Sequence, residues 1–233
     1  MGREVTLLDY PYLEQSFDWN SKELIEELAQ FFADKINQYD KVKIVGVSLG
    51  ATISLRIKEI LGDKVEHLYL ISSGGHKVAS FRKEMILTHL RDLGAEEFLL
   101  KSLEVGSKSE YQNSDFKSHF HQAHKYAQVY WDYYTQELWK SEHAINAQIA
   151  LTNLVAASVE VNFEHLLSKF QDQISIIWAD LDKVFSMRFY EKFKKLCPRS
   201  QFYLLQGVGH FSPLETPKRI LHILKGYEKP LTI

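Results

Sequence analysis

The sequence predicts an α/β protein built on a doubly wound, mostly parallel β-sheet. Two observations predict this class. Short runs of β-branched and aromatic residues alternate with longer amphipathic stretches, as in proteins made of right-handed β-α-β crossovers. The short runs are apolar almost throughout, which is expected of parallel strands that helices cover on both faces.

Five runs have the length and composition of strands, and turn residues bound each of them. The predicted strands are Glu4–Asp9, Lys41–Val47, Val65–Ser72, Ile174–Ala179 and Gln201–Leu205.

Helical patterns lie between these runs. The first begins at Ser21, where a serine followed by Glu23 and Glu26 is typical of a capped helix start. Apolar residues then recur at the spacing of one helix face. The predicted helices are Ser21–Asn37, Leu49–Leu61, Arg188–Leu196 and Pro217–Tyr227.

The alternation breaks from about residue 78 to residue 167, where no run has the pattern of a strand. The stretch is rich in aromatic residues between Phe116 and Trp139, and its length and helical patterns predict a helical insertion placed like a lid. Because no convincing linker separates it, we predict a single domain over residues 1–233.

Composition limits the partners and the location. Hydrophobic residues make up 45% of the chain, and 28 basic against 30 acidic side chains give a formal net charge of −2. This balance argues against nucleic acid or an anionic membrane as the partner. Cys197 is the only cysteine, so no internal disulfide forms, and with no apolar run long enough to span a membrane we expect a cytoplasmic location.

A G-x-S-x-G pentapeptide, Gly46-Val47-Ser48-Leu49-Gly50, joins a predicted strand to a predicted helix. This is the setting of a nucleophile elbow, in which a sharp turn exposes the serine hydroxyl above the end of the strand. The alternative is an ordinary tight turn with an incidental serine. The flanking strand and helix favour the elbow, with Ser48 as the nucleophile.

An acid and a histidine follow the last two predicted strands. Asp180 and Asp182 come after Ile174–Ala179, and His210 lies in a glycine-flanked turn after Gln201–Leu205. A serine hydroxyl needs a base to take its proton, and the base needs a carboxylate to fix its tautomer. The residue types therefore fit a hydrolytic triad.

In these segments the chain resembles the α/β-hydrolase fold family. The resembling segments read LLDYP, KVKIVGVSLGA, IIWADLDKVF and QGVGHFSPLETP, and they span most of the chain outside the insertion. The order serine, acid, histidine is that of the family. The resemblance implies that Ser48, Asp182 and His210 are catalytic, with Asp180 in reserve, because Ala179 stands where the family has a glycine. It also implies that the backbone N–H of Leu49 helps to hold the oxyanion.

One feature of the family is missing. No His-Gly turn, which normally supplies the second oxyanion donor, precedes the elbow, and the resemblance implies that the first strands of the fold are absent. In one explanation, Val5–Leu8 moves into the vacant place beside the nucleophile strand, and the N–H of Tyr10 or Tyr12 becomes the donor. In the other, a second chain supplies the strands, as a homodimer would, or the site is impaired. Pro11 has no N–H to offer.

Two further patterns carry weaker signals. His119, His121 and His124 resemble a metal-binding run, but on a helix the first two point about 200° apart. Ser72–His76 follows a strand and could line a pocket, although it offers no acid. Cys197 lacks the environment of a reactive thiol. We expect no metal and no cofactor.

The sequence thus favours a serine hydrolase acting on a carboxylic ester or thioester through an acyl-enzyme on Ser48. The aromatic insertion suggests an apolar or aryl acyl group. An alternative enzyme is a thioesterase for acyl-CoA or an acyl-carrier protein. An alternative of another class is a catalytically impaired, hydrolase-like binding protein completed by a partner chain.

Overall fold

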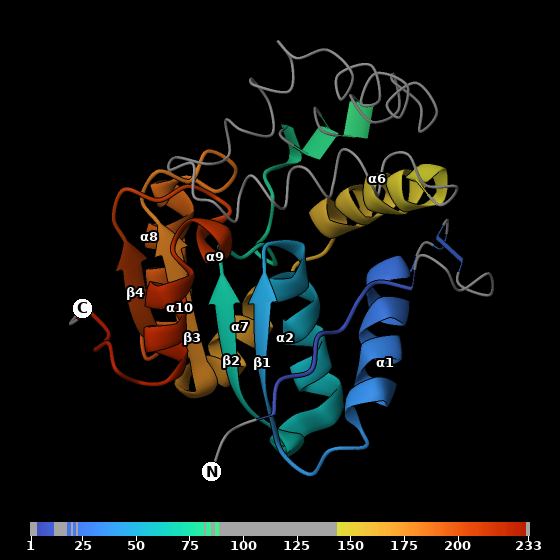
Figure 1. Cartoon of the computed structure of the whole chain (residues 1–233). Helices are drawn as coiled ribbons and strands as arrows, with labels where there is room; N and C mark the ends of the chain where they lie inside the picture. The colour runs from blue at the N-terminus through green and yellow to red at the C-terminus, as the bar shows by residue number, and fades with distance from the viewer. Residues whose placement is uncertain are drawn as a thin grey trace.

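The computed structural model of the protein describes residues 4–11, 18, 19, 21, 23–81, 83, 84, 87, 88 and 144–231. Its centre, in this part of the chain, is a sheet of four parallel strands in the order β1-β2-β3-β4 (Figure 1). The strands are β1 (Val42–Val47), β2 (Val65–Ile71), β3 (Ile174–Ala179) and β4 (Gln201–Leu205). The predicted fold class is confirmed in a shortened form.

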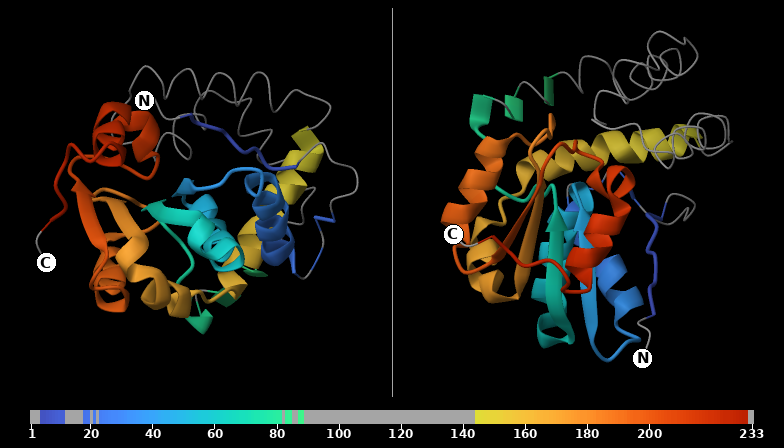
Figure 2. Two further views of the ribbon diagram at one scale, coloured as in Figure 1. Left: turned by 90° about the horizontal axis from the view of Figure 1, so that it is seen from below. Right: turned by 60° about the vertical axis from the view of Figure 1, so that its left-hand side comes forward.

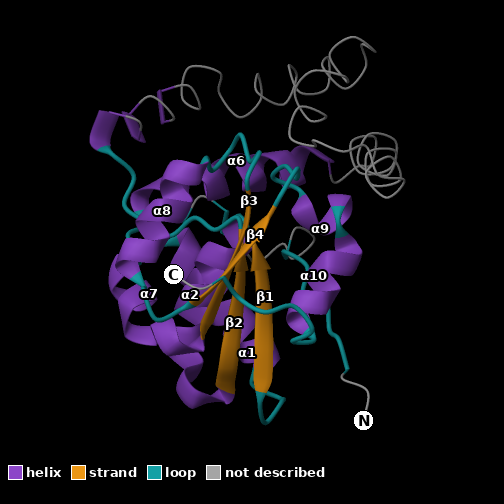
Figure 3. Ribbon diagram, turned by 90° about the vertical axis from the view of Figure 1, so that its left-hand side faces the viewer, coloured by secondary structure: helices purple, strands orange, loops and turns teal. Residues whose placement is uncertain are grey.

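Helices cover both faces of the sheet, as Figure 3 shows edge-on. One face packs against α1 (Leu24–Ile36), α2 (Leu49–Leu61), α7 (Glu164–Phe170) and α8 (Met187–Leu196), and the other against α10 (Pro217–Leu224). Short 3₁₀ turns at Gly62–Lys64 and Gln171–Gln173 lead into β2 and β3. The short helix α9 (Ser212–Glu215) precedes α10, and α6 (Ala144–Glu160) precedes α7.

The period of two along a strand divides the core into two clusters. In β3, Ile176 and Trp178 pack with Phe193 of α8, whereas Ile177 and Ala179 pack with Ile220 of α10. Every residue of β3 is buried, because the strand lies inside the sheet with helices over both faces. Its nearly continuous apolar sequence follows from this position.

The four strands and four helices that were predicted and are observed agree in their boundaries to within a few residues, but the start of the first helix differs in its capping. The first helix begins at Leu24, so Ser21 is not its N-cap. Its hydroxyl instead accepts the N–H of Glu23 at 3.1 Å and donates to Glu27 at 2.6 Å. The serine braces the approach to the helix from outside it.

The predicted first strand, Glu4–Asp9, is wrong. These residues form no strand, and the side chains of Val5 and Leu7 are 82% and 86% exposed. The Thr6 hydroxyl contacts that of Tyr39 at 3.1 Å, and the ring of Tyr10 packs on α1. Among the described residues no strand pairs with this run, so Val5–Leu8 does not take the vacant place beside the nucleophile strand, and β1 lies at one edge of the described sheet with β2 as its neighbour.

The predicted insertion falls largely outside the described residues, including Phe116 to Trp139 and the three histidines at 119, 121 and 124. Of its described part, α6 lies above α2, at the end of the sheet toward which the strands point (Figures 1 and 2). The Asn153 amide donates to the Trp19 carbonyl at 3.0 Å, and the Phe163 N–H donates to the Gly75 carbonyl at 2.8 Å. Among the described residues, no helix has the length and apolarity needed to cross a membrane.

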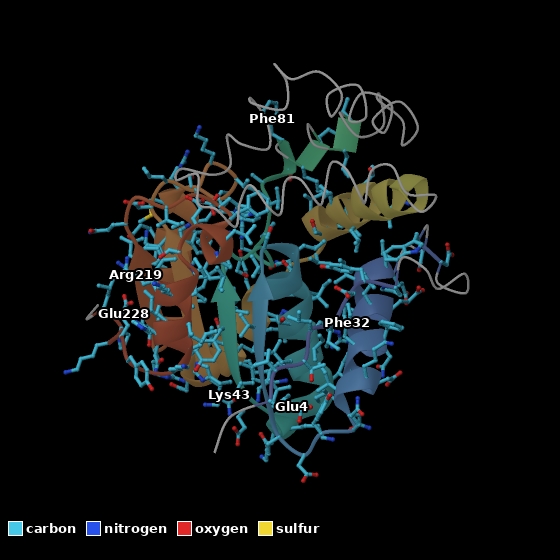
Figure 4. All side chains as sticks on the ribbon, viewed as in Figure 1. Glu4, Phe32, Lys43, Phe81, Arg219 and Glu228 are labelled. Atoms are coloured by element: carbon cyan, nitrogen blue, oxygen red, sulfur yellow. The ribbon has the colours of Figure 1, made fainter. Side chains whose placement is uncertain are left out.

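The end of the described chain is tied to β4 (Figure 4). Arg219 of α10 pairs with Glu228 at 2.8 Å and donates to the Leu204 carbonyl at 3.1 Å. The Leu231 N–H donates to the Phe202 carbonyl at 2.7 Å. These bonds hold α10 and the segment after it against the sheet.

Cys197 ends α8 inside the core, where its Sγ lies 3.1 Å from the Phe193 carbonyl. Burial raises the pKa of this thiol to about 11. At pH 8 only roughly one thiol in a thousand would be a thiolate, which is the reactive form. We therefore predict that Ellman's reagent leaves Cys197 unmodified in folded protein and titrates one thiol in urea. Rapid reaction of the native protein would contradict the buried position.

Candidate active site

Ser48 lies in a sharp turn between β1 and α2. Its backbone has φ 52° and ψ −113°, a conformation that costs a non-glycine residue about 1–3 kcal/mol. The Ser48 N–H donates to the Ile71 carbonyl at 2.8 Å, which fixes the turn to β2. The side chain is partly exposed, as a nucleophile must be. The structure thus gives Ser48 the strained turn expected of a nucleophile elbow.

The first glycine of the pentapeptide is where helix and strand come closest. A Cβ on Gly46 would lie 2.6 Å from the Ala51 Cα, the Gly50 carbonyl oxygen and the Ser54 Oγ. A Cβ on Gly50 would meet nothing within 4 Å. Only the first of the two glycines is required by packing.

Asp182 and His210 meet Ser48 at the carboxyl ends of the strands. His210 Nε2 lies 3.1 Å from Ser48 Oγ, and His210 Nδ1 lies 2.8 Å from Asp182 Oδ2. Both Asp182 and His210 are buried. The structure therefore brings together the three residues that the sequence pointed to, in one hydrogen-bonded chain from hydroxyl to carboxylate.

The Asp182 carboxylate is held by its own loop. Its Oδ1 accepts the N–H groups of Val184 and Phe185, both at 2.8 Å, and the Trp178 indole N–H donates to the Phe185 carbonyl at 2.9 Å. Since Oδ1 is occupied in this way, Oδ2 faces the imidazole. The ring of Phe185 lies 5.7 Å from that of His210 and limits its movement.

Asp180, the reserve acid, points elsewhere. Its Oδ1 accepts the N–H groups of Gly207 and Val208 at 2.8 and 3.3 Å, in the turn that carries His210. On the far side of the same turn, both oxygens of the buried Glu215 accept the Gly209 N–H, at 3.1 and 3.2 Å. Sequence reasoning gave Glu215 no role. The available signal was a carboxylate five residues after the histidine in GHFSPLE.

The turn after β2 packs against the site without offering it an acid. Ser72 has φ 46°, and both Ser72 and Ser73 are fully buried. His76 stacks its ring against that of Phe189 at 4.4 Å. This turn therefore belongs to the packed core next to the elbow.

The candidate oxyanion donors have unequal positions. Leu49 is the first residue of α2, and N–H groups in a first helical turn lack partners within the helix. The N–H groups of Ala51 and Thr52, later in this turn, donate to the Ser48 carbonyl. The ring of Tyr10 packs edge-on against Phe32, with centroids 5.8 Å apart, and burial raises the pKa of its hydroxyl to about 12. Tyr12 lies outside the described residues.

The sequence matches the model of the alpha/beta hydrolase fold family over residues 2–217. The chain belongs to this family. Membership identifies it as a hydrolase, and the family resemblance noted in the sequence is confirmed. No curated protein sequence matches the chain.

Solved structures show the same fold at low identity. A 2-hydroxy-6-oxo-6-phenylhexa-2,4-dienoate hydrolase from Rhodococcus sp. strain RHA1 has a TM-score of 0.65 and 13% identity, over 91% of this chain and 73% of that one. A thermophilic esterase from Thermogutta terrifontis has a TM-score of 0.55 and 14% identity, over 87% and 71%. A bacterial membrane phospholipase A has a TM-score of 0.62 and 20% identity, over 92% and 64%.

Within the described part of the chain, no group of three or more His, Cys, Asp or Glu side chains could hold a metal ion. His119, His121 and His124, whose spacing resembles a metal-binding run, lie outside the described residues.

The two glycines of the elbow give a matched pair of variants. We predict that Gly46→Ala lowers the melting temperature by several degrees, because its Cβ would force α2 away from β1, an overpacking that costs about 1–3 kcal/mol. Gly50→Ala should leave stability equal or slightly higher, since alanine favours the helix and meets open space. Thermal unfolding followed by circular dichroism measures both. Equal melting temperatures for the two variants would refute the close approach at Gly46.

Proposed function

We propose that the protein is a serine hydrolase that cleaves a carboxylic ester or thioester through an acyl-enzyme on Ser48. The observation that carries the proposal is the chain of hydrogen bonds from Ser48 Oγ through His210 to Asp182, at 3.1 and 2.8 Å. Such an arrangement activates a hydroxyl that is otherwise a weak nucleophile.

In the proposed acylation step, Ser48 Oγ attacks the acyl carbon while His210 Nε2 takes its proton. The tetrahedral intermediate collapses as His210 gives that proton to the leaving alcohol or thiol, and the acyl group stays on Ser48. His210 then takes a proton from water, which attacks the acyl-enzyme, and returns the proton to Ser48 Oγ as the acid leaves. Asp182 holds the imidazole with Nε2 toward Ser48 and stabilises its charged form.

The oxyanion of each tetrahedral intermediate needs hydrogen-bond donors. We assign the first to the Leu49 N–H at the start of α2, where the helix dipole also favours negative charge. The candidates for the second donor are the Tyr10 N–H, which is among the described residues, and the Tyr12 N–H, which is not. Each donor is worth on the order of 10²–10³ in rate.

We infer an ester or thioester substrate from the chemistry proposed for Ser48, because the fold alone does not specify a substrate. The Thermogutta protein with a similar fold is an esterase, which agrees with ester cleavage. The aromatic residues of the predicted lid favour an apolar or aryl acyl group. Short aryl esters tested against acyl-CoA and acyl-carrier thioesters separate an esterase from an acyl-carrier thioesterase. We expect small molecules as substrates, with neither metal nor cofactor required.

A fluorophosphonate probe tests the nucleophile directly. We predict that the probe labels folded protein at Ser48, and that Ser48→Ala loses both the label and ester turnover while its melting temperature changes little. The serine is partly exposed and its hydroxyl is hydrogen-bonded to His210, at the long distance of 3.1 Å, so its loss should cost little stability. If the Ser48 peptide is recovered unlabelled from folded protein, the proposed function fails.

Removing the charge of Asp180 and of Asp182, the two acids of the loop after β3, should affect kcat very differently. Because Asp182 contacts the imidazole, Asp182→Asn should lower kcat by on the order of 10⁴, as expected when the wrong histidine tautomer is held. Asp180→Asn should cost far less, because an amide oxygen still accepts backbone N–H bonds. Steady-state kinetics of both variants decide the assignment. A larger loss in Asp180→Asn would make Asp180 the acid.

One observation favours a second candidate, a hydrolase-like binding protein completed by a partner chain. Strand β1 is an edge strand of the described sheet, and Val45 in its middle is 44% exposed. Such an edge offers unpaired backbone groups to another strand. A homodimer by sedimentation, combined with absence of fluorophosphonate labelling, would favour this candidate over the enzyme.

A further inference from the structure

The position of His210 depends on the preceding turn, whose glycines do not by themselves fix the backbone conformation. The turn runs from Gly207 to Gly209 after β4, and Gly207 has φ 69°. Glycine adopts such conformations easily and fixes none of them. The hydrogen bond between Ser48 Oγ and His210 Nε2 is 3.1 Å long, so a shift of about 1 Å in this turn would break it and cost up to about 10² in rate.

Three consecutive N–H groups of this turn end on carboxylates. Asp180 Oδ1 takes those of Gly207 and Val208, and Glu215 takes that of Gly209. Val208 and Gly209 are buried, so their N–H groups need acceptors within the protein. Hydrogen bonds to an ionised acceptor are about twice as strong as neutral ones. The turn is thus held by bonds to two carboxylates outside it, of which the bond from the Gly207 N–H, at 2.8 Å, has the short length typical of an ionised acceptor.

The backbone that carries each carboxylate is itself held by hydrogen bonds. The Asp180 N–H donates to the Leu205 carbonyl, and the next N–H, of Leu181, donates to the Val208 carbonyl, both at 3.1 Å. Glu215 ends the short helix α9, and its N–H donates to the Phe211 carbonyl at 3.1 Å. The acid loop therefore contacts the histidine turn through the Asp180 carboxylate and the Leu181 N–H, and the His210 ring through Asp182.

We propose that Asp180 and Glu215 are positioning residues that clamp the turn Gly207–Gly209 between them and so set the distance from His210 to Ser48. The proposal rests on the proposed function for its catalytic consequence, but its structural content does not need turnover. It gives the two carboxylates a role that is separate from that of Asp182.

The test compares variants that remove the acceptor with variants that keep it. Asp180→Ala and Glu215→Ala should lower kcat and the rate of fluorophosphonate labelling by about tenfold to 100-fold, with KM within about twofold. Asp180→Asn and Glu215→Gln retain an acceptor oxygen and should recover most of both rates. Glu164→Gln is the control, because this carboxylate of α7 accepts the Lys77 N–H at 2.9 Å and pairs with Lys192 at 2.6 Å, and neither contact involves the His210 turn. It should behave as the unchanged protein.

A second readout does not depend on activity. The proton on His210 Nδ1, bonded to Asp182, should give a far-downfield proton NMR signal that disappears in His210→Gln. The two alanine variants should broaden or shift this signal, and the amide variants and Glu164→Gln should keep it. If the unchanged protein shows the signal but neither turns over nor labels, the proposed function fails while the NMR comparison still decides the clamp.

Unchanged rates and an unchanged signal in folded Asp180→Ala and Glu215→Ala would overturn the clamp. If Glu215→Ala does not fold, Glu215→Asp takes its place, since it keeps the charge but is one methylene too short to hold the Gly209 N–H. It should lose rate and signal as the alanine variant would. Behaviour equal to that of the unchanged protein would again overturn the proposal.

Discussion

The close packing of α2 against the end of β1 is the constraint on which the site depends. It leaves no space for a side chain at Gly46, and it forces the chain to reverse within a few residues. The reversal puts Ser48 in a strained conformation at the top of the strand, with its hydroxyl outward and the first N–H groups of α2 beside it. The strain is held by the packing of α2 and by the bond from the Ser48 N–H to β2.

The parallel sheet converts this local turn into a site. Because β1, β3 and β4 run in one direction, the loops that follow them emerge at the same edge, and Ser48, Asp182 and His210 meet there although 162 residues separate the first from the last. No single loop carries the chemistry. The site consists of three loop ends whose relative positions are set by strand register and by the bonds between the loops.

Much of this was visible in the sequence, for physical reasons that differ by element. Strands β3 and β4 were predicted with their observed limits because buried parallel strands are apolar throughout and turns bound them. The run from Glu4 to Asp9 has a similar composition, but it forms no strand. Composition shows that a segment could pair in a sheet, but not whether a neighbouring strand is present. In the part of the chain that the structure describes, no strand pairs with this run, and Val5 and Leu7 stay exposed.

The two aspartates of the acid loop show where sequence reasoning stops. Asp180 and Asp182 are the same residue type, two positions apart, after the same strand. From the sequence, only the resemblance to the family favours Asp182 over Asp180 as the catalytic acid. The two carboxylates differ in their hydrogen-bond partners. One oxygen of Asp182 accepts N–H groups of its own loop and the other contacts the imidazole. Asp180 instead accepts an N–H of the turn that precedes His210.

Glu215 is a harder case, since the role proposed for it depends on a backbone N–H, that of Gly209, which it accepts in a buried place. A sequence shows which side chains are present but not which backbone groups lack a partner. The need for Glu215 arises only when the Gly209 N–H is buried by the fold. Residues of this kind become visible when every buried backbone donor is traced to its acceptor. In this chain that tracing leads from the turn before His210 to two carboxylates, Asp180 and Glu215, that accept the N–H groups of this turn.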